Sequence, residues 1–322
     1  MKQAGLRHAV GIDFGGTFIK MALVSERGEV KARAKIPTGE AATQAAWLEA
    51  VGKGFDQLRA KAGPAAEDLK GIGVGVPGFV DYERGFIYDL ANVPGWSNVL
   101  LAPRLEEKFR LHVRVDNDVN AMAVGECTFG VGRAYQHAVF VTLGTGVGGA
   151  LLINNRLYRG AYSMAGEIGH MPIQMDGVKS PQGRGGLEQY VGNRRIVERA
   201  VQMLEQGRTS AISDLARGNT SAITPELIEK AARQGDGLAR EIYDFVADCI
   251  ATAFASVTYL IQPQAFIVGG GVAQSGEVLF DPLRKHLQER LSPCFAERIE
   301  VKAAELGNDA GVIGAATLVM IE

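Results

Sequence analysis

The chain has 322 residues, of which 47% are hydrophobic and 22% charged, and its mean hydropathy is +0.03. This is the composition of a folded globular protein, and the length predicts about two domains. The 34 basic and 36 acidic residues leave a formal net charge of −2. This balance argues against nucleic acid as a main partner, because no excess of cations is available to neutralise phosphates.

Expected strands and helices alternate along the chain, which favours the α/β class. In the first half the expected strands are 9–14, 19–25, 29–35, 71–76 and 112–115, and the expected helices are 41–62, 103–110 and 118–129. In the second half the expected strands are 137–143, 150–153, 156–158, 265–268 and 299–303, and the expected helices are 187–206, 225–233, 237–261, 282–290 and 310–321.

The cellular compartment is indicated by the cysteines and by the apolar runs. Three widely separated cysteines without a CxxC pair indicate a reducing cytoplasm. No apolar run long enough for a signal peptide precedes Asp13. The apolar run Cys249–Ile261 is shorter than the roughly 20 residues that a membrane helix needs. We therefore expect no membrane span here, but a buried helix stopped by Pro263 and followed by a buried strand.

Two segments about 130 residues apart share one pattern. Residues 10–30 and 139–158 each read as an apolar strand, a turn rich in Gly and Thr, a second apolar strand, a polar turn and a third strand. Such a repeat predicts two domains built in the same way.

Glycine is over-represented, with 41 residues, and the excess gathers in turns after apolar strands. These turns are DFGGT at 13–17, LGTGVGG at 143–149 and GGGV at 269–272. Glycine lets a ligand approach the backbone closely, and successive amides in a turn can bind phosphate oxygens. One such turn is equally explained as a tight hairpin, but three together favour phosphate binding. Asp13 beside the first turn suits Mg²⁺ held with phosphates, although an Asp there can also cap a turn.

Six motifs occur in the order typical of one family. They are DFGGT (13–17), GVGVPGFVD (73–81), NVPGW (92–96), NDVNA (117–121), LGTGVGG (143–149) and GEIGH (166–170). With them the chain resembles ROK-family sugar kinases of the actin/hexokinase-like superfamily, bacterial glucokinases among them. The resemblance covers residues 10 to about 314. It implies an α/β fold with two ribonuclease-H-like domains and an interdomain cleft: a smaller domain of residues 1–117 plus 306–322, and a larger one of residues 118–305.

The resemblance also implies where the substrates bind. ATP and Mg²⁺ are expected at Asp13, Gly15, Gly16, Thr17, Lys20, Thr145, Gly146, Gly270 and Gly271, with Asp13 meeting the metal through ATP. The sugar is expected at Gly78, Asn92, Asn117, Asp118, Glu167, His170 and Glu188. A hexose needs side chains that donate and accept hydrogen bonds in fixed directions. Each of these polar residues alone can also be a cap or a surface side chain, which is the favoured interpretation for Asn92 or Glu188 taken singly, and only the combination favours a sugar.

Asp118 is the expected catalytic base. Phosphoryl transfer to an alcohol needs a group that accepts the hydroxyl proton, and a positioned carboxylate does this. By resemblance, Asp118 matches the catalytic aspartate of the family within NDVNA. The alternative is that Asn117 and Asp118 form an ordinary N-cap pair. Asp116 matches no functional position of the family and is expected to be a surface or capping residue.

One departure from the family concerns zinc. Most members carry a zinc site formed by the His of GEIGH and three cysteines ahead of the glutamate that corresponds to Glu188. Here that stretch reads KSPQGRGGLE (179–188), with Lys179, Pro181 and Gly186 at the cysteine positions. His170 alone cannot form a tetrahedral zinc centre, so no zinc is expected, and His170 is expected to keep its sugar contact.

The expected function is ATP-dependent phosphorylation of a hexose, with glucose converted to glucose 6-phosphate. Kinases for N-acetylmannosamine, N-acetylglucosamine, fructose or allose share most of the motifs and remain alternatives, as does another phosphoryl donor. A sugar-responsive repressor is disfavoured because only nine residues precede the first motif strand. A catalytically inactive sugar-binding protein is disfavoured by Asp13, Asp118 and the glycine turns. Because family members are commonly dimers or tetramers, a homodimer or homotetramer is expected.

Overall fold

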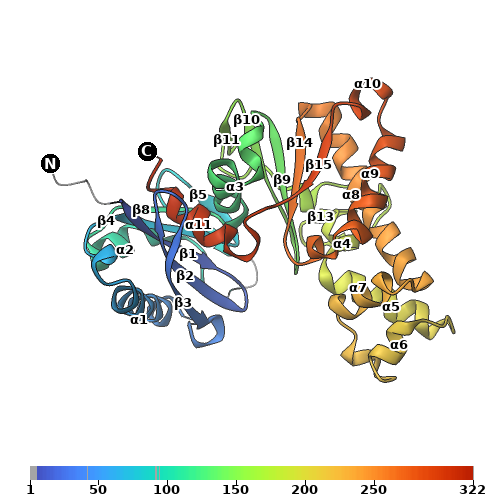
Figure 1. Ribbon diagram of the computed structural model, residues 1–322, viewed down its shortest axis with the longest axis horizontal. Coiled ribbons are helices and arrows are strands. Elements are labelled where there is room, and N and C mark those ends of the chain that lie inside the picture. The colour runs from blue at the N-terminus through green and yellow to red at the C-terminus, as the bar shows by residue number, and fades with distance from the viewer. Residues whose placement is uncertain (1–5, 42, 91–92, 94, 322) are drawn as a thin grey trace. The chain divides into compact units, whose positions relative to one another are not determined.

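The chain folds into two units, each of which has its own sheet and its own core (Figure 1). The computed structural model describes residues 6–41, 43–90, 93 and 95–321. Unit 1 consists of Met1–Ala134, Arg156–Ala165 and Glu305–Glu322, and unit 2 consists of Tyr135–Asn155 and Gly166–Ala304. Both units combine a mixed sheet with helices, so the predicted α/β class is confirmed.

The boundary between the units differs from the predicted one, which lay after residue 117. Helix α3 (Asp118–Phe129) belongs to unit 1 and not to the larger domain. This helix packs on α11 (Ala310–Thr317) near the end of the chain. A Cβ atom at Gly314 would overlap the carbonyl oxygen of Ala121, so only glycine allows the two helices to approach this closely at that position. A small apolar cluster joins them: Ala121, Val124, Ala315 and Leu318. The close contact explains why α3 cannot be assigned to the other unit.

Unit 1 contains a five-stranded sheet in the order β3-β2-β1-β4-β8. The strands are β1 (His8–Phe14), β2 (Phe18–Ser25), β3 (Val30–Pro37), β4 (Leu69–Val76) and β8 (Val113–Asn117). The first three strands form an antiparallel meander, whereas β1, β4 and β8 run parallel. This arrangement places the carboxyl ends of three strands at one edge of the sheet.

An aromatic cluster lies in the core of unit 1. Trp47 lies on α1 (Gln44–Ala62), and its ring centroid is 5.4 Å from those of Phe14 and Trp96. All three side chains are buried, and they include both tryptophans of the chain. The unit also contains α2 (Leu101–Phe109), β11 (Arg156–Tyr158) and the short helices η1 (Thr38–Ala41), η2 (Gly63–Ala66), η3 (Val131–Ala134) and η7 (Gly307–Asp309).

A second, three-stranded antiparallel sheet follows β4 and was not predicted. It consists of β5 (Gly78–Asp81), β6 (Phe86–Leu90) and β7 (Val99–Leu100). Gly78 begins it with φ +146°, and a Cβ atom there would overlap the carbonyl oxygen of Asp89. No strand was predicted between residues 76 and 112, because the proline and glycine at the start of β5 hide the strand pattern.

Unit 2 repeats the plan of unit 1. Its strands are β9 (Ala138–Leu143), β10 (Val147–Ile153), β14 (Ala265–Gly269) and β15 (Glu300–Ala303), and a small hairpin adds β12 (Lys179–Ser180) and β13 (Gly183–Arg184). β9 pairs antiparallel with β10 and parallel with β14, which pairs parallel with β15. The order β10-β9-β14-β15 matches β2-β1-β4-β8, so the predicted internal repeat is confirmed.

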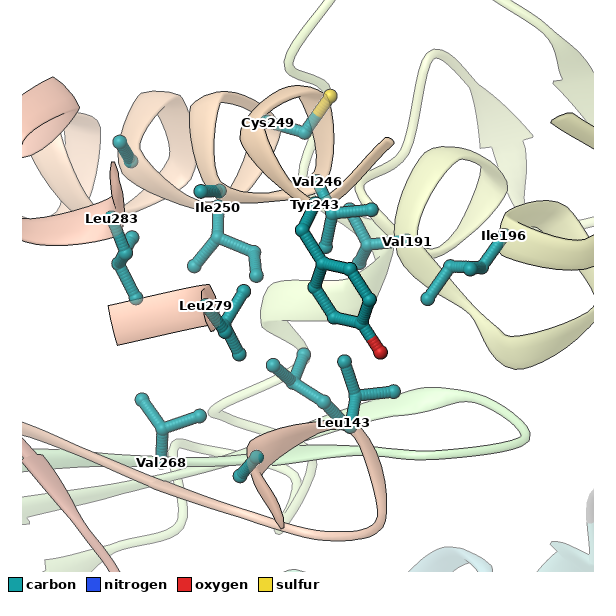
Figure 2. Packing of buried hydrophobic residues seen from close by; sticks show 14 of the residues in the cluster. Leu143, Val191, Ile196, Tyr243, Val246, Cys249, Ile250, Val268, Leu279 and Leu283 are labelled. Carbon is teal, nitrogen blue, oxygen red and sulfur yellow. The ribbon is translucent and has the colours of Figure 1, made fainter. Parts of the chain in front are cut away.

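The helices of unit 2 include one long apolar helix, whose buried residues belong to the core of the unit. These helices are α4 (Glu188–Val191), α5 (Asn193–Glu205), α6 (Ala211–Leu215), α7 (Pro225–Arg233), α8 (Gly237–Ile261), α9 (Glu277–Arg290), α10 (Pro293–Ala296), η4 (Ile168–His170), η5 (Thr220–Ala222) and η6 (Val272–Ser275). Figure 2 shows Tyr243 and Ile250 of α8 among Leu279, Leu283 and Val268. By length and composition α8 could cross a membrane, but most of it is buried inside unit 2. The predicted buried helix followed by a buried strand is confirmed.

The predicted single helix over 187–206 is divided at Gly192, whose ψ of 150° is extended. The cause is a contact with a glycine turn, because the backbone N–H of Asn193 donates to the carbonyl of Gly144 at 2.9 Å. A Cβ atom at Gly192 would also lie 3.1 Å from the carbonyl oxygen of Thr145. A tertiary contact therefore overrides the helical pattern at this position.

Candidate active site

Acidic residues lie at the carboxyl ends of the parallel strands of unit 1. Asp13 of β1 pairs with Gly75 of β4, which pairs in turn with Asp116 of β8. A Cβ atom at Gly75 would lie 3.3 Å from the Cα of Asp118, so the first residue of α3 rests on this glycine. Asp13 and Asp118 therefore lie at the same edge of the sheet, where open α/β sheets bind ligands.

Asp13 sits in a partly buried, cationic setting. Its side chain is 18% exposed, and its Oδ2 lies 3.3 Å from Nζ of Lys20. Burial raises the pKa of Asp13, and the charge of Lys20 opposes that rise. A Cβ atom at Gly311, in the first turn of α11, would lie 2.9 Å from the same carboxylate oxygen. The positive end of the helix dipole favours a negative charge there, and a carboxylate is a group that would hold Mg²⁺ together with phosphates.

The DFGGT turn joins β1 to β2 as a tight hairpin. The backbone N–H of Gly15 donates to the carbonyl of Phe18 at 3.1 Å, and the Thr38 hydroxyl donates to the Gly15 carbonyl at 2.7 Å. Gly16 and Thr17 at the tip are exposed, and a Cβ atom at Gly16 would meet open space. The hairpin reading is therefore correct, and the turn also leaves two predicted ATP-binding residues open to a ligand.

The segment that begins α3 brings three predicted sugar-binding residues together. The Asn117 side chain caps the helix by accepting hydrogen bonds from the backbone N–H groups of Val119 at 2.8 Å and Asn120 at 3.3 Å. Its Nδ2 donates to the carbonyl of Gly78 at 3.2 Å. Asp118 is the first helical residue, and its Oδ1 accepts from the Val119 N–H at 3.0 Å. The cap is thus Asn117, and Asp118 is half-buried beside it.

Asp116 is not the surface or capping residue that the sequence predicted. It is buried, with 2% of its side chain exposed, and it forms an ion pair with Arg159 at 2.6 Å. Burial raises the pKa of Asp116, and the charge of Arg159 opposes the rise. Arg159 was missed by sequence reasoning, because its partner lies 43 residues away and no local pattern joins the two.

In unit 2, the predicted sugar-binding residues Glu167, His170 and Glu188 lie together. Oε2 of Glu167 is 3.6 Å from Nε2 of His170. Burial raises the pKa of Glu167, the nearby Glu188 raises it further, and His170 lowers it. Oε2 of Glu188, at the start of α4, accepts a hydrogen bond from the backbone N–H of Val147 at 2.9 Å. Two carboxylates and an imidazole therefore lie near one another, and as a group they can both donate and accept hydrogen bonds.

The glycine turns of unit 2 adjoin this group. The LGTGVGG turn connects β9 to β10, and a Cβ atom at Gly146 would lie 2.5 Å from Oε2 of Glu188. Gly270, after β14, has φ +88°, and a Cβ atom there would overlap the carbonyl oxygen of Leu143. Thr145 and Gly271 are exposed. Both turns thus meet at one place, and each leaves a predicted ATP-binding residue open.

The segment between His170 and Glu188 is held by hydrogen bonds in the absence of cysteine. The backbone N–H of Ile173 donates to the Gly185 carbonyl at 2.9 Å, and β12 pairs with β13. The Tyr190 hydroxyl accepts from the backbone N–H of Val178 at 3.1 Å. Within the described ranges, no group of three or more His, Cys, Asp or Glu side chains is placed to hold a metal ion. These residues do not fit a zinc ion, whose structural sites need four ligands.

Asn92 is the one predicted site residue that lies outside the described residues.

Comparison with known proteins gives a consistent result. The sequence model described as the ROK family matches residues 9–322. The chain is 35% identical over 315 residues to a glucokinase of Halalkalibacterium halodurans, covering 97% of this chain and 95% of that one. It is 29% identical to a xylose repressor of Caldicellulosiruptor bescii, covering 97% of this chain and 77% of the repressor.

Among solved structures, a ROK family glucokinase of Streptomyces griseus in complex with glucose and AMPPNP matches with a TM-score of 0.85 and 33% identity. The match covers 97% of this chain and 98% of that one. A ROK hexokinase of Thermus thermophilus matches with a TM-score of 0.75 and 26% identity over 96% of both chains. These matches confirm the predicted fold class.

Proposed function

Because the chain belongs to the ROK family, we propose that it is a sugar kinase that transfers the terminal phosphoryl group of ATP to glucose. The observation that carries this proposal is the placement of Asp13 and Asp118 at one edge of the unit 1 sheet. Phosphoryl transfer needs an acidic residue on the metal–phosphate side and a carboxylate that accepts the proton of the attacking hydroxyl. Asp13 at the end of β1 and Asp118 at the start of α3 supply these two carboxylates at one edge of the sheet.

Asp118 accepts the proton in this proposal. As the bond between the sugar oxygen and the γ-phosphorus of ATP forms, the bond from that phosphorus to the oxygen it shares with the β-phosphate breaks, and ADP leaves with its electrons. The hydroxyl proton moves to the Asp118 carboxylate. The Asn117 cap holds α3, so the carboxylate of the first helical residue is fixed by the backbone around it. A proton acceptor that is already oriented contributes about 10²–10⁴-fold to the rate.

In this proposal, Gly78, Asn92, Asn117 and Asp118 are the residues of unit 1 that bind sugar hydroxyls. The residues proposed for sugar binding in unit 2 are Glu167, His170 and Glu188. The two carboxylates of the second group accept hydrogen bonds from hydroxyls, and the imidazole can donate one. Such fixed polar groups select a sugar by the direction of its hydroxyls, because a buried group left unpaired by a wrong sugar costs binding energy.

ATP binds in this proposal along the glycine turns at Gly15, Gly16, Thr17, Thr145, Gly146, Gly270 and Gly271, with Lys20 as a cation for its phosphates. Mg²⁺ would be held by the phosphates together with Asp13. When bound, the ion neutralises charge on the transferring phosphoryl group. The role of the protein is to present one carboxylate at the strand end and turns that a phosphate can approach.

The sugar preference is tested by ADP release over a panel of hexoses and N-acetylhexosamines. We expect glucose to give faster release than fructose or N-acetylmannosamine at equal concentration, because the glucokinase relatives are similar along nearly the whole chain. An N-acetylated sugar that is at least about tenfold better in kcat/KM would contradict the glucose assignment and keep the kinase assignment. Sugar binding without any ADP formation would favour a regulator, a role that the name of the repressor relative suggests.

We also propose that the protein needs no zinc. The purified protein should contain far less than one zinc per chain by elemental analysis, and a chelator should leave activity unchanged once Mg²⁺ is restored. The reason is that the segment before Glu188 is closed by backbone pairing and by the Tyr190 hydroxyl, with no thiolate present. One zinc per chain would contradict this expectation.

A cytoplasmic location and a homodimeric or homotetrameric state complete the proposal, with no nucleic acid or membrane as a partner. The three cysteines, Cys127, Cys249 and Cys294, are free thiols, as is usual in a reducing compartment.

A further inference from the structure

Asp116 is a buried charge for which the proposed reaction has no use. Four hydrogen bonds reach its carboxylate. Oδ2 accepts from Nε and Nη2 of Arg159 at 3.0 and 2.6 Å. Oδ1 accepts from the backbone N–H of Asn117 at 2.8 Å and from Nδ2 of Asn120 at 2.9 Å. A buried carboxylate is costly unless it is paired and hydrogen-bonded, and here both oxygens are fully engaged.

The two donors to Oδ1 lie on either side of Asp118. Asn117 precedes it as the helix cap, and Asn120 follows within the first turn and is 5% exposed. Gly75 lies beneath, so that the Asp118 backbone rests on the neighbouring strand. The Asp116 carboxylate therefore fixes the backbone before Asp118 and the side chain after it.

Arg159 is itself held from more than one direction. Its guanidinium lies 3.8 Å from the centroid of the Tyr82 ring, and its side chain is 21% exposed. Its carbonyl accepts a hydrogen bond from the backbone N–H of Ala165 at 2.9 Å, which closes the segment 159–165 into a loop. The planar guanidinium both stacks on a ring and donates to a carboxylate, and a lysine cannot reproduce this combination.

We propose that Asp116 and Arg159 form a positioning pair for Asp118. The pair ties the loop 159–165 to the end of β8 and holds the start of α3 in the orientation in which the Asp118 carboxylate reaches the sugar hydroxyl. This inference rests on the proposed role of Asp118 as the proton acceptor. Neither Asp116 nor Arg159 touches substrate in it, and both act through the helix start.

The expected effect falls on the chemical step. A displacement of about 1 Å at a reacting group can cost about 10²-fold in rate. We therefore expect Arg159→Gln and Asp116→Asn to lower kcat by about 10- to 100-fold, while the KM for ATP stays within about twofold of wild type. Arg159→Lys keeps the positive charge but loses the paired Nε and Nη2 donors of the guanidinium, so its kcat should lie between those of wild type and Arg159→Gln.

The matched control is Arg208→Gln. Arg208 also donates two hydrogen bonds to one carboxylate, that of Glu241, at 3.0 and 2.7 Å, but its side chain is 43% exposed. We expect its kcat to equal that of wild type, because exposed ion pairs contribute little. The full chain is used throughout, with ATP and the best substrate of the hexose panel. Tryptophan fluorescence measures the folded fraction at the assay temperature, since both tryptophans lie in the unit 1 core.

Two results would overturn the positioning role. One is a folded Arg159→Gln or Asp116→Asn protein whose kcat lies within about twofold of wild type. The other is a kcat loss that disappears when the rate is divided by the folded fraction, because a merely structural pair predicts that. If a single variant does not fold, the double variant Asp116→Asn/Arg159→Gln replaces it, since it leaves no unpaired buried charge. The same two criteria then apply.

Failure of this inference is separable from failure of the proposed function. If wild type turns over a sugar and Asp118→Asn does not, kcat of the pair variants decides the positioning role alone. If wild type turns over no sugar, the proposed function fails. In that case, hydrogen exchange of the backbone amides of residues 117–121 still tests whether Asp116 and Arg159 hold the start of α3. Faster exchange there in Arg159→Gln than in Arg208→Gln supports the pair as what holds the start of α3, and equal exchange overturns it.

Discussion

Replacement of Asp118 by asparagine is expected to reduce kcat by about 10²–10⁴-fold and to leave the binding of sugar and ATP nearly unchanged. The amide has almost the same shape and can still hydrogen-bond a hydroxyl, so the affinity of the ground state should change little. It cannot take the proton, so the loss should fall on the chemical step. Steady-state rates and calorimetric binding of sugar and nucleotide measure the two effects separately.

The structure sharpens this test, because Asn117 and not Asp118 is the helix cap. Asp118 lies in the first turn, where a carboxylate stabilises the helix dipole by about 0.3–1 kcal/mol, so the variant should stay folded. Asp56→Asn on the exposed face of α1 is the matched control, for which we expect wild-type kcat. A variant at Asp118 that keeps more than about a tenth of wild-type kcat would remove this residue from the role of base.

Gly314→Ala is expected to lower the free energy of unfolding of unit 1 by about 3 kcal/mol. The added methyl group would overlap the Ala121 carbonyl and lie 3.0 Å from the backbone nitrogen of Gly125, so α3 and α11 must separate. Backbone atoms at a helix crossing cannot rotate away as a side chain can. Because α3 begins at Asp118, we expect a loss of activity with the loss of stability.

Urea denaturation followed by tryptophan fluorescence measures this change. Trp47 and Trp96, the two tryptophans of the chain, are both buried in unit 1, so the signal reports that unit. The matched control is Gly52→Ala in the middle of α1, where the new Cβ would meet only the flexible end of Lys108 at 3.2 Å. That variant should be stabilised by up to about 1 kcal/mol through helix propensity. A Gly314→Ala protein as stable as wild type would show that the helices can adjust.

Local patterns predicted much of the fold. α7 and α8 have the predicted bounds, with Thr224 as the cap of α7, because a cap, a proline or a glycine marks each helix end within the sequence itself. The strand, glycine turn and strand that begin each sheet were also predicted, because the glycines that separate the two apolar strands are visible in the sequence itself. What local patterns missed depends on distant partners. The sheet β5-β6-β7 needs strand pairing across turns, and the helix break at Gly192 needs the turn at Gly144.

The candidate site likewise contains residues that local patterns predicted and residues that depend on distant partners. Asn117, Asp118 and Gly78 were predicted together and lie together, as do Glu167, His170 and Glu188, because the motifs occur at strand and helix ends that each fold brings close. The prediction for Asp116 was wrong, since a carboxylate beside a helix cap resembles a surface residue until its ion-pair partner is known. That partner, Arg159, belongs to a segment that returns to unit 1 only after the chain has entered unit 2.

This discontinuous path has a consequence for how the protein is made. Unit 1 contains residues 305–322 as well as the first 134, so it cannot be completed until α11 has been synthesised. Until then the sheet lacks the helix that covers Gly11 and Gly73, where a Cβ atom would overlap the carbonyls of Val312 and Ala315. Ribosomes add about 5–20 residues per second, so the roughly 170 residues between the first and the last segment of unit 1 impose a delay of about 10–30 s. During that interval the segment that carries Asp118 lacks the helix that packs on α3 in the folded unit.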